Sequence, residues 1–152
     1  MDNRRRKVSR GGSTLEIAFL FPVFVFLFVG AFDWGYYAHA LISTEAAART
    51  VANFASTNST DATDSTSACT LALEELRILP NVASSTTCGS GSPVTVTTTL
   101  VGSGQTNTNS SYGGDNAAVV SVQYTTTQLI PIPGLLTNQM TFYRTVEMEL
   151  RN

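Results

Sequence analysis

A long apolar segment near the N-terminus limits what this chain can fold into. Residues 17–32 are apolar, with Pro22 and Gly30 as interruptions, and the carboxylate of Glu16 stands directly before them. At about 1.5 Å per residue, a helix from residue 15 to 32 is roughly 27 Å long, which nearly matches a bilayer core of about 30 Å. The pattern therefore predicts a membrane-spanning helix. An acid costs up to roughly 3 kcal/mol at the centre of such a helix and less near its ends, which makes Glu16 a candidate functional residue.

The charges on either side of this segment predict its orientation. Five of the 9 Lys and Arg residues lie between positions 4 and 10, directly before the apolar segment. Basic residues on one side of a membrane helix hold that side in the cytoplasm, so we expect the rest of the chain to be extracytoplasmic. The remainder is acidic and poor in Lys and Arg, which argues against nucleic acid as a partner. We expect a basic leader at residues 1–11, a transmembrane and spine helix at 12–55, and a head at 56–152.

A cleaved secretory signal and a plain membrane anchor are alternatives for the same segment. Ala38-His39-Ala40 resembles a small-x-small cleavage site, and cleavage there would leave Leu41 as the first residue. The apolar segment is long for a signal peptide, however, and bulky residues separate it from Ala38. Trp34, Tyr36 and Tyr37 are typical of an aromatic belt at the membrane surface. We therefore favour a helix that remains in the chain.

The helical pattern continues beyond the aromatic residues to Ala55. Glu45 and Arg49 form an i,i+4 pair in the favourable order. Pro22 removes one backbone hydrogen bond, so it predicts either a simple kink or a weak point at which the helix bends on leaving the bilayer. Residues on one face of the outer half are predicted to pack on the head: Leu41, Ala48, Val51, Ala52 and Ala55.

The residues around Glu16 resemble those of a known family. A basic stretch, Gly11, four residues, Glu16 and an apolar helix together resemble the class III signal of type IV pilins and pseudopilins. Pro22, six residues after Glu16, and the Asp33-Trp34-Gly35 exit make the chain most similar to TadE-like pseudopilins of tight-adherence (Flp) pilus systems. The resemblance covers roughly residues 8–55. Ile17 departs from the Tyr of Flp pilins and the frequent Phe of TadE-like chains, which, with the long body, disfavours a major pilin.

This resemblance implies a processing site and an assembly residue. A prepilin peptidase would cut after Gly11 and leave Gly12 as the new N-terminus, with Glu16 fifth; the double glycine also allows cleavage after Gly12. The resemblance implies that Glu16 meets the new α-amine of a neighbouring subunit during assembly. The implied partners are the inner membrane, the prepilin peptidase, other pilin or pseudopilin subunits and the pilus assembly platform.

The head contains the only two cysteines, Cys69 and Cys88. An extracytoplasmic location favours a disulfide between them, worth about 3 kcal/mol on a chain-entropy estimate. They flank a predicted helix over residues 70–79, which Pro80 ends. Residues 56–68 are polar and without periodicity, and predict a loop in which Asp61 and Asp64 are simply solvated.

The rest of the head predicts β-structure. Residues 94–101, 117–128 and 140–150 are rich in β-branched residues and alternate in polarity. Residues 102–114 predict a connection, and residues 129–134, with two prolines, predict a break. The predicted fold class is α+β: a long N-terminal helix, membrane-embedded in its first half, packed against a small antiparallel sheet with one disulfide.

No catalytic constellation emerges from the sequence. His39 is the only histidine, and the carboxylates at Glu74, Glu75, Glu147 and Glu149 fit solvated faces. We expect no enzyme activity, metal or cofactor. The first functional hypothesis is a minor pilin-like subunit of a Flp pilus that acts in pilus biogenesis and adhesion from the bacterial inner membrane or within the pilus. The alternative is a membrane-anchored or secreted extracytoplasmic binding module.

Overall fold

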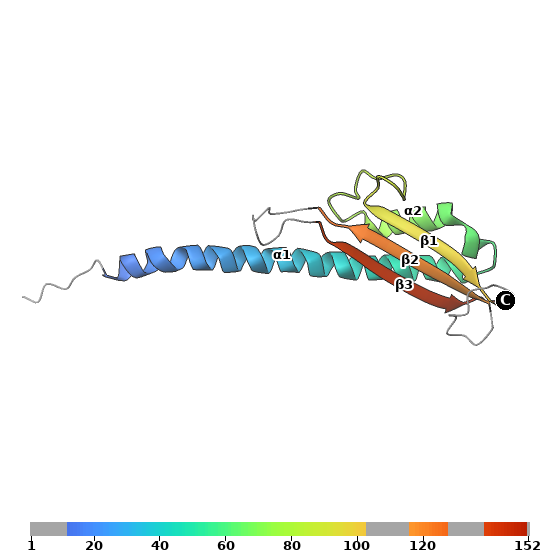
Figure 1. The fold of residues 1–152 in the computed structure, drawn as a ribbon, viewed down its shortest axis with the longest axis horizontal. Helices are drawn as coiled ribbons and strands as arrows, with labels where there is room; N and C mark the ends of the chain where they lie inside the picture. The colour runs from blue at the N-terminus through green and yellow to red at the C-terminus, as the bar shows by residue number, and fades with distance from the viewer. Residues whose placement is uncertain (1–11, 103–115, 128–138, 152) are drawn as a thin grey trace, which may run out of the picture. The chain divides into compact units, whose positions relative to one another are not determined.

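The computed structural model describes residues 12–102, 116–127 and 139–151 (Figure 1). Within these residues, helix α1 is Gly12–Ala55 and helix α2 is Ser65–Leu76, with a 3-10 turn at Asp61–Thr63 between them. Strands β1 (Val94–Val101), β2 (Ala117–Thr125) and β3 (Thr141–Glu149) form an antiparallel sheet in the order β1-β2-β3. The predicted α+β class, with a long N-terminal helix, a small sheet and one disulfide, is confirmed.

The chain divides into two compact units, Met1–Tyr36 and Tyr37–Asn152. The described part of the first unit is the N-terminal half of α1. The second unit contains the outer half of α1, helix α2 and the whole sheet. The outer half of α1 therefore belongs structurally with the head rather than with the apolar segment.

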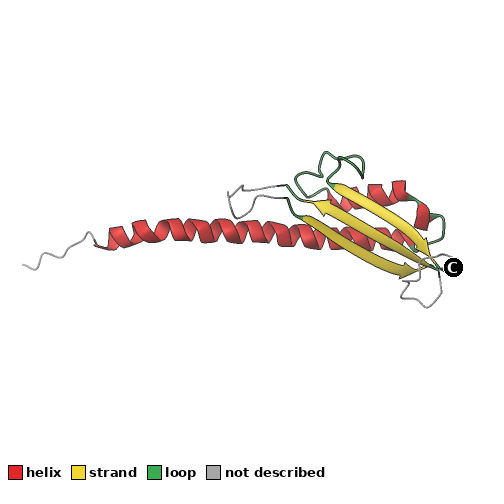
Figure 2. Ribbon diagram, in the orientation of Figure 1, coloured by secondary structure: helices red, strands yellow, loops and turns green. Residues whose placement is uncertain are grey.

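The second unit has one buried core, and both helices contribute to it from the same side of the sheet (Figure 2). Strand β2 shows why the sequence alternates: Ala118, Val120, Val122 and Tyr124 are fully buried, and the residues between them face outward. The helices use small residues, which let backbones approach closely. The fully buried members from the helices are Ala40, Ala47, Ala48, Val51, Ala52, Ala55, Ala68, Ala72 and Leu76.

The predicted inner face of α1 is largely correct. Ala48, Val51, Ala52 and Ala55 are fully buried, but Leu41 is only half-buried because Ala40 and Thr44 occupy the centre of the buried face. Thr44 avoids an unpaired buried hydroxyl, since its Oγ1 donates to the Ala40 carbonyl at 2.7 Å. The expected ion pair between Glu45 and Arg49 is present on the exposed side.

The prediction for α2 was wrong at both ends. The helix begins at Ser65 rather than at residue 70 and ends at Leu76 rather than at residue 79. Residues predicted as loop therefore form the 3-10 turn and the first turn of α2. The reason is Asp64, whose carboxylate caps the helix and so allows a Ser/Thr-rich segment without apolar periodicity to be helical.

The strands lie close to their predicted places. Strand β1 has the predicted bounds, while β2 ends at Thr125 and β3 covers Thr141–Glu149, each slightly shorter than expected. Val120 pairs with Thr98 on one side and with Val146 on the other, which fixes the register of all three strands. Apart from Gly102, the predicted connection at 102–114 lies outside the described residues, as does the predicted break at 129–134.

Candidate functional site

The candidate processing site lies at the start of α1. Gly12 is the first residue of the helix, whereas Gly11 lies outside the described residues. Glu16 is exposed and stands one helical turn after Gly12. Residues four apart share one face of a helix, about 6 Å apart along its axis. A carboxylate at position 16 is therefore within reach of an amine at position 12, and the same holds for an amine at position 13.

The helix beyond Glu16 is apolar on all sides. Every described side chain from Thr14 to Phe28 is exposed, including large residues such as Phe19 and Phe28. A helix that presents apolar side chains around its whole circumference is stable in lipid rather than in water. By length and composition, Thr14–Ala55 contains a segment that can cross a membrane. This agrees with the predicted span.

Pro22 lies inside this apolar stretch without ending the helix. Helix α1 continues through it, although proline has no N–H to donate to the Ala18 carbonyl. Pro22 therefore interrupts the hydrogen-bond pattern of α1 without ending the helix. Whether it acts as a simple kink or as a point of bending stays a prediction.

Asp33 belongs to the Asp33-Trp34-Gly35 motif at the exit of the span, and it is buried. Its side chain is 3% exposed, whereas its neighbours Phe32 and Trp34 are 61% and 79% exposed. Its Oδ1 atom is buried and has no hydrogen-bond partner within the described residues. A buried carboxylate without a partner is costly. The signal in the sequence was its spacing, because Asp33 lies seven residues before the buried Ala40 and eleven before the buried Thr44, and both intervals place residues on one face of a helix.

The aromatic residues at the exit of the span differ in exposure. Trp34 is the most exposed large apolar residue of this stretch, while Tyr36 and Tyr37 are half-buried. The segment Ala38-His39-Ala40 is helical, and Ala40 is fully buried in the core of the second unit. The role of Trp34, Tyr36 and Tyr37 as a membrane belt stays a prediction.

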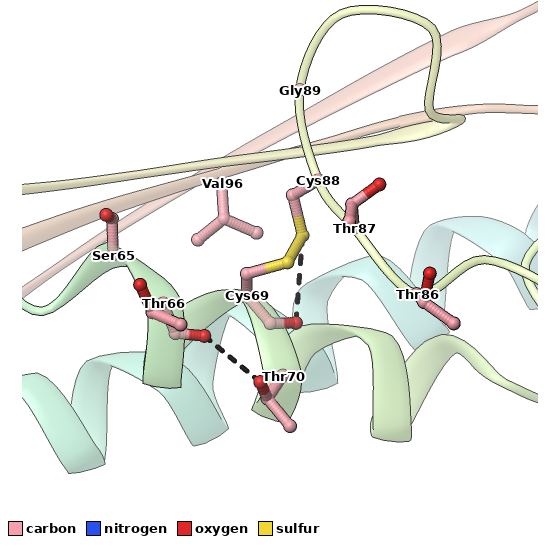
Figure 3. Close-up of a pocket in the computed structure, with 9 residues that line it drawn as sticks. All are labelled: Ser65, Thr66, Cys69, Thr70, Thr86, Thr87, Cys88, Gly89 and Val96. Atoms are coloured by element: carbon pink, nitrogen blue, oxygen red, sulfur yellow. Dashed lines mark hydrogen bonds between the residues drawn. A yellow bond between two sulfur atoms is a disulfide. The ribbon is translucent and has the colours of Figure 1, made fainter.

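The predicted disulfide joins Cys69 of α2 to Cys88, which precedes β1. The S–S distance is 2.08 Å, and the Cα–Cα distance of 5.8 Å is usual for a disulfide. Figure 3 shows the bond between the helix and the loop that carries Thr86, Thr87 and Gly89. The disulfide thus fixes the long connection between α2 and the sheet to the helix.

The prediction that Asp61 and Asp64 are simply solvated was wrong, because both carboxylates accept hydrogen bonds from neighbouring residues. Oδ1 of Asp64 accepts hydrogen bonds from the backbone N–H groups of Thr66 and Ser67 at 3.0 and 3.1 Å, and Ser67 Oγ donates to Oδ2 at 2.6 Å. The hydrogen bond from the Ser67 side chain, followed by those from the backbone, lowers the pKa of Asp64 from its ordinary value. Asp61 accepts from Asn58 Nδ2 at 2.8 Å. Both acids order the segment that leads into α2.

The described residues contain no group of three or more His, Cys, Asp or Glu side chains that could hold a metal ion. His39 lies on the exposed side of α1. Glu74 and Glu75 are exposed on α2, as expected, and Glu75 accepts a 3.3 Å hydrogen bond from Thr50 of α1.

These features define a class of protein: one apolar N-terminal helix that can span a membrane, continued by an α+β unit with a disulfide. Within that class, residues 11–53 match the family model described as "TadE-like protein". The match includes Gly11, Gly12, Glu16, Pro22 and Asp33, and it confirms the resemblance for this part of the chain. It covers less than a third of the sequence. Neither curated proteins nor solved structures gave a match to the chain.

Proposed function

We propose that the chain is a minor pilin-like subunit, a pseudopilin of a Flp or tight-adherence pilus system, which a prepilin peptidase matures. The observation that carries the proposal is the position of Glu16, one helical turn after Gly12 at the entrance of an apolar helix that matches the TadE-like family model. In this role the chain acts in pilus biogenesis and adhesion as a structural subunit and not as an enzyme.

The chemistry at Glu16 supports a role in assembly. Cleavage after Gly11 creates an α-amine with an ordinary pKa of about 8, which is cationic at neutral pH. A carboxylate at the fifth mature position can neutralise this charge within one subunit or on its neighbour, and the attraction is stronger at the low dielectric of the membrane than in water. Glu16 would thereby set the axial register between subunits.

The topology in this proposal follows from charge. The basic leader stays in the cytoplasm, α1 crosses the inner membrane, and the head is extracytoplasmic or part of the extracellular pilus. The proposed partners are the prepilin peptidase at the leader, other pilin and pseudopilin subunits along α1, and the assembly platform. The alternative function is an extracytoplasmic binding module that is membrane-anchored or secreted and does not enter a pilus.

Determining the N-terminus of the mature protein by mass spectrometry separates these functions. We expect Gly12, or Ser13 if the second glycine is the last leader residue, in cells that contain the prepilin peptidase, and the uncleaved leader in cells that lack it. An intact N-terminus in both strains would indicate a plain anchor, and Leu41 a secretory signal. Either result would refute maturation by this peptidase.

The role of Glu16 requires a second experiment. Glu16→Ala and Glu16→Gln are expected to insert into the membrane as the native chain does and to reduce piliation strongly, whereas the matched variant Thr14→Val is expected to have normal pili. Normal piliation in the Glu16 variants would refute the register role. Cleavage of these variants, followed in the same cells, separates a defect in assembly from one in maturation.

A further inference from the structure

A groove lies beside the disulfide in the second unit. It has a volume of about 340 Å³, near the lower end of the range of about 300–1,000 Å³ that is usual for small-ligand sites. One wall comes from the start of α2 and the other from the loop before β1 (Figure 3). Five of the side chains that line it carry hydroxyl groups: Ser65, Thr66, Thr70, Thr86 and Thr87.

Most of these hydroxyl groups are not used by the fold. Thr70 Oγ1 donates to the Thr66 carbonyl at 3.1 Å. Ser65, Thr66, Thr86 and Thr87 are exposed residues, and their hydroxyls have no hydrogen bond to any residue that the structure describes. Each hydroxyl can donate one hydrogen bond and accept two. The groove therefore presents donors and acceptors from two opposing walls.

The groove is also uncharged. None of the described residues that line it is ionisable, apart from the two cysteines of the disulfide, which do not titrate. Asp64, next in sequence to Ser65, has its carboxylate engaged by Thr66 and Ser67. An anionic or cationic ligand would lose water here without gaining a counter-charge. A neutral ligand is favoured.

The floor of the groove adds an apolar contact. The disulfide and Val96 of β1 lie between the two hydroxyl-bearing walls (Figure 3). A pyranose ring has the matching chemistry, because its hydroxyls project around the edge and its C–H groups form an apolar face. The small volume suits one ring rather than a longer ligand.

The walls are held in place before any ligand binds. The disulfide ties Cys88 to α2, and the Gly89 N–H donates to the Val94 carbonyl at 2.9 Å. The Asp64 cap fixes the first turn of α2, which carries Ser65 and Thr66. A preorganised site loses less conformational entropy on binding than a flexible one.

We propose that this groove binds one neutral sugar ring of a glycan. This is a function of the head beyond assembly into a pilus, and it requires neither cleavage at Gly11 nor incorporation of the subunit. The hydroxyls of Ser65, Thr66, Thr86 and Thr87 hydrogen-bond the sugar hydroxyls, while the disulfide and Val96 contact the C–H face of the ring.

Saturation-transfer NMR on the full chain in lipid nanodiscs tests the proposal. The probes are the methyl glycosides of glucose, galactose, mannose and N-acetylglucosamine, with glucuronate as a charged counterpart. Detergents with sugar headgroups are avoided because they would compete. We expect saturation transfer to at least one of the four neutral glycosides and none to glucuronate. No transfer to any neutral glycoside, or tighter binding of glucuronate, would overturn the proposal.

Isosteric variants locate the binding. Thr66→Val and Thr86→Val each remove one hydroxyl at nearly constant volume, and the double variant is expected to weaken the sugar affinity by about tenfold or more. The matched control is Thr97→Val, since Thr97 is exposed on β1 next to Val96 and points to the opposite face of the sheet. Equal sugar affinity in the native protein and the double variant would refute the assignment of sugar binding to this groove. If the double variant loses the circular dichroism spectrum of the native fold, the affinities of the two single variants are compared with the native affinity instead.

These results are independent of the proposed pilin function. Binding is measured on purified protein, and maturation and piliation are measured in cells. A negative result in the sugar-binding experiment would therefore not bear on the role of Glu16. A negative result in the maturation experiment would likewise not bear on the sugar site.

Discussion

The phenolic hydroxyl of Tyr124 donates a 2.6 Å hydrogen bond to Asn81 Oδ1 and so joins the central strand β2 to the connection after α2. Asn81 completes the link, because its Nδ2 donates to the Thr125 carbonyl at 2.8 Å. Tyr124 is fully buried and Asn81 is half-buried. One asparagine thereby satisfies two polar groups of β2 and positions the long segment that leads to Cys88.

Tyr124→Phe should destabilise the second unit. The substitution keeps the ring in the core but leaves Asn81 Oδ1 without its donor, which costs about 1 kcal/mol at a half-buried site. Thermal unfolding of the full chain in detergent, followed by circular dichroism, should show a fall of a few degrees. Tyr143→Phe is the control, because Tyr143 is 60% exposed on β3. The melting temperature of this variant should match that of the native chain. Equal values for both variants would contradict a role for the Tyr124 hydroxyl.

Such long-range contacts show what the sequence could not predict. The span was predictable because its apolar residues are continuous over the length of a bilayer core. The three strands and the inner face of α1 were predictable because their apolar residues recur at 2- and 3.6-residue spacing. Asn81 and Tyr124 are 43 residues apart, and nothing in the residues around either one indicates the other. The start of α2 was missed for a local reason: a single capping acid determines it, and Asp64 is one of several polar residues in that segment.

The candidate site divides in the same way. The placement of Glu16 one helical turn after Gly12 was predictable because their spacing in the sequence is itself the signal. The burial of Asp33 was missed, because an acid at the end of an apolar segment ordinarily faces water and its helical spacing from Ala40 is the only local sign that it is buried. The groove beside the disulfide combines the start of α2, a loop and β1, so it exists only once the chain is folded.

Asp64 should make the stability of α2 dependent on pH. Hydrogen bonds from Ser67 and Thr66 lower its folded-state pKa below the ordinary value of 3.8, so the folded state binds a proton less readily than the unfolded state. The stabilisation is therefore present above pH 3.8 and is lost as the pH falls through the lowered pKa. The difference in melting temperature between native chain and Asp64→Ala should be constant near neutral pH and shrink below pH 3.8.

Two variants make this test specific. Asp64→Asn retains a good capping side chain without the charge, so its melting temperature should lie above that of Asp64→Ala and should lack this pH dependence. Glu74→Ala, at an exposed position of the same helix, should follow the native pH profile. A native-like profile in Asp64→Asn would exclude Asp64 as the titrating group.

Removing the disulfide should cost the second unit about 3 kcal/mol on the chain-entropy estimate, because the bond closes a loop between α2 and β1. Cys69→Ser with Cys88→Ser, and reduction of the native chain, should lower the melting temperature by similar amounts. Alkylation should modify two thiols per chain after reduction and none before it. A native melting temperature in the double variant would show that the core alone fixes this connection.

Asp33→Asn should leave the protein as stable as the native chain or make it more stable. The carboxylate is buried and Oδ1 has no partner among the described residues, so the isosteric amide removes the cost of burying a charge. The matched control is Asp61→Asn, at a position where Asn58 donates to the carboxylate, and it should be neutral or slightly destabilising. A clear fall in melting temperature for Asp33→Asn alone would mean that the charge at position 33 is paired in the assembled protein.

Pro22→Ala tests whether the interruption in α1 is a point of bending. Alanine restores the N–H that can bond to the Ala18 carbonyl and removes the ring that clashes with the preceding turn, a gain of up to about 3 kcal/mol in a water-exposed helix. Hydrogen exchange of the full chain in nanodiscs should become slower at the amides that follow Ala18, whereas Val23→Ala should leave exchange unchanged. If the helix must bend at Pro22 when a subunit leaves the bilayer, Pro22→Ala should insert and be cleaved normally but enter pili less. Slower exchange with normal piliation would identify Pro22 as a simple kink without a function in extraction.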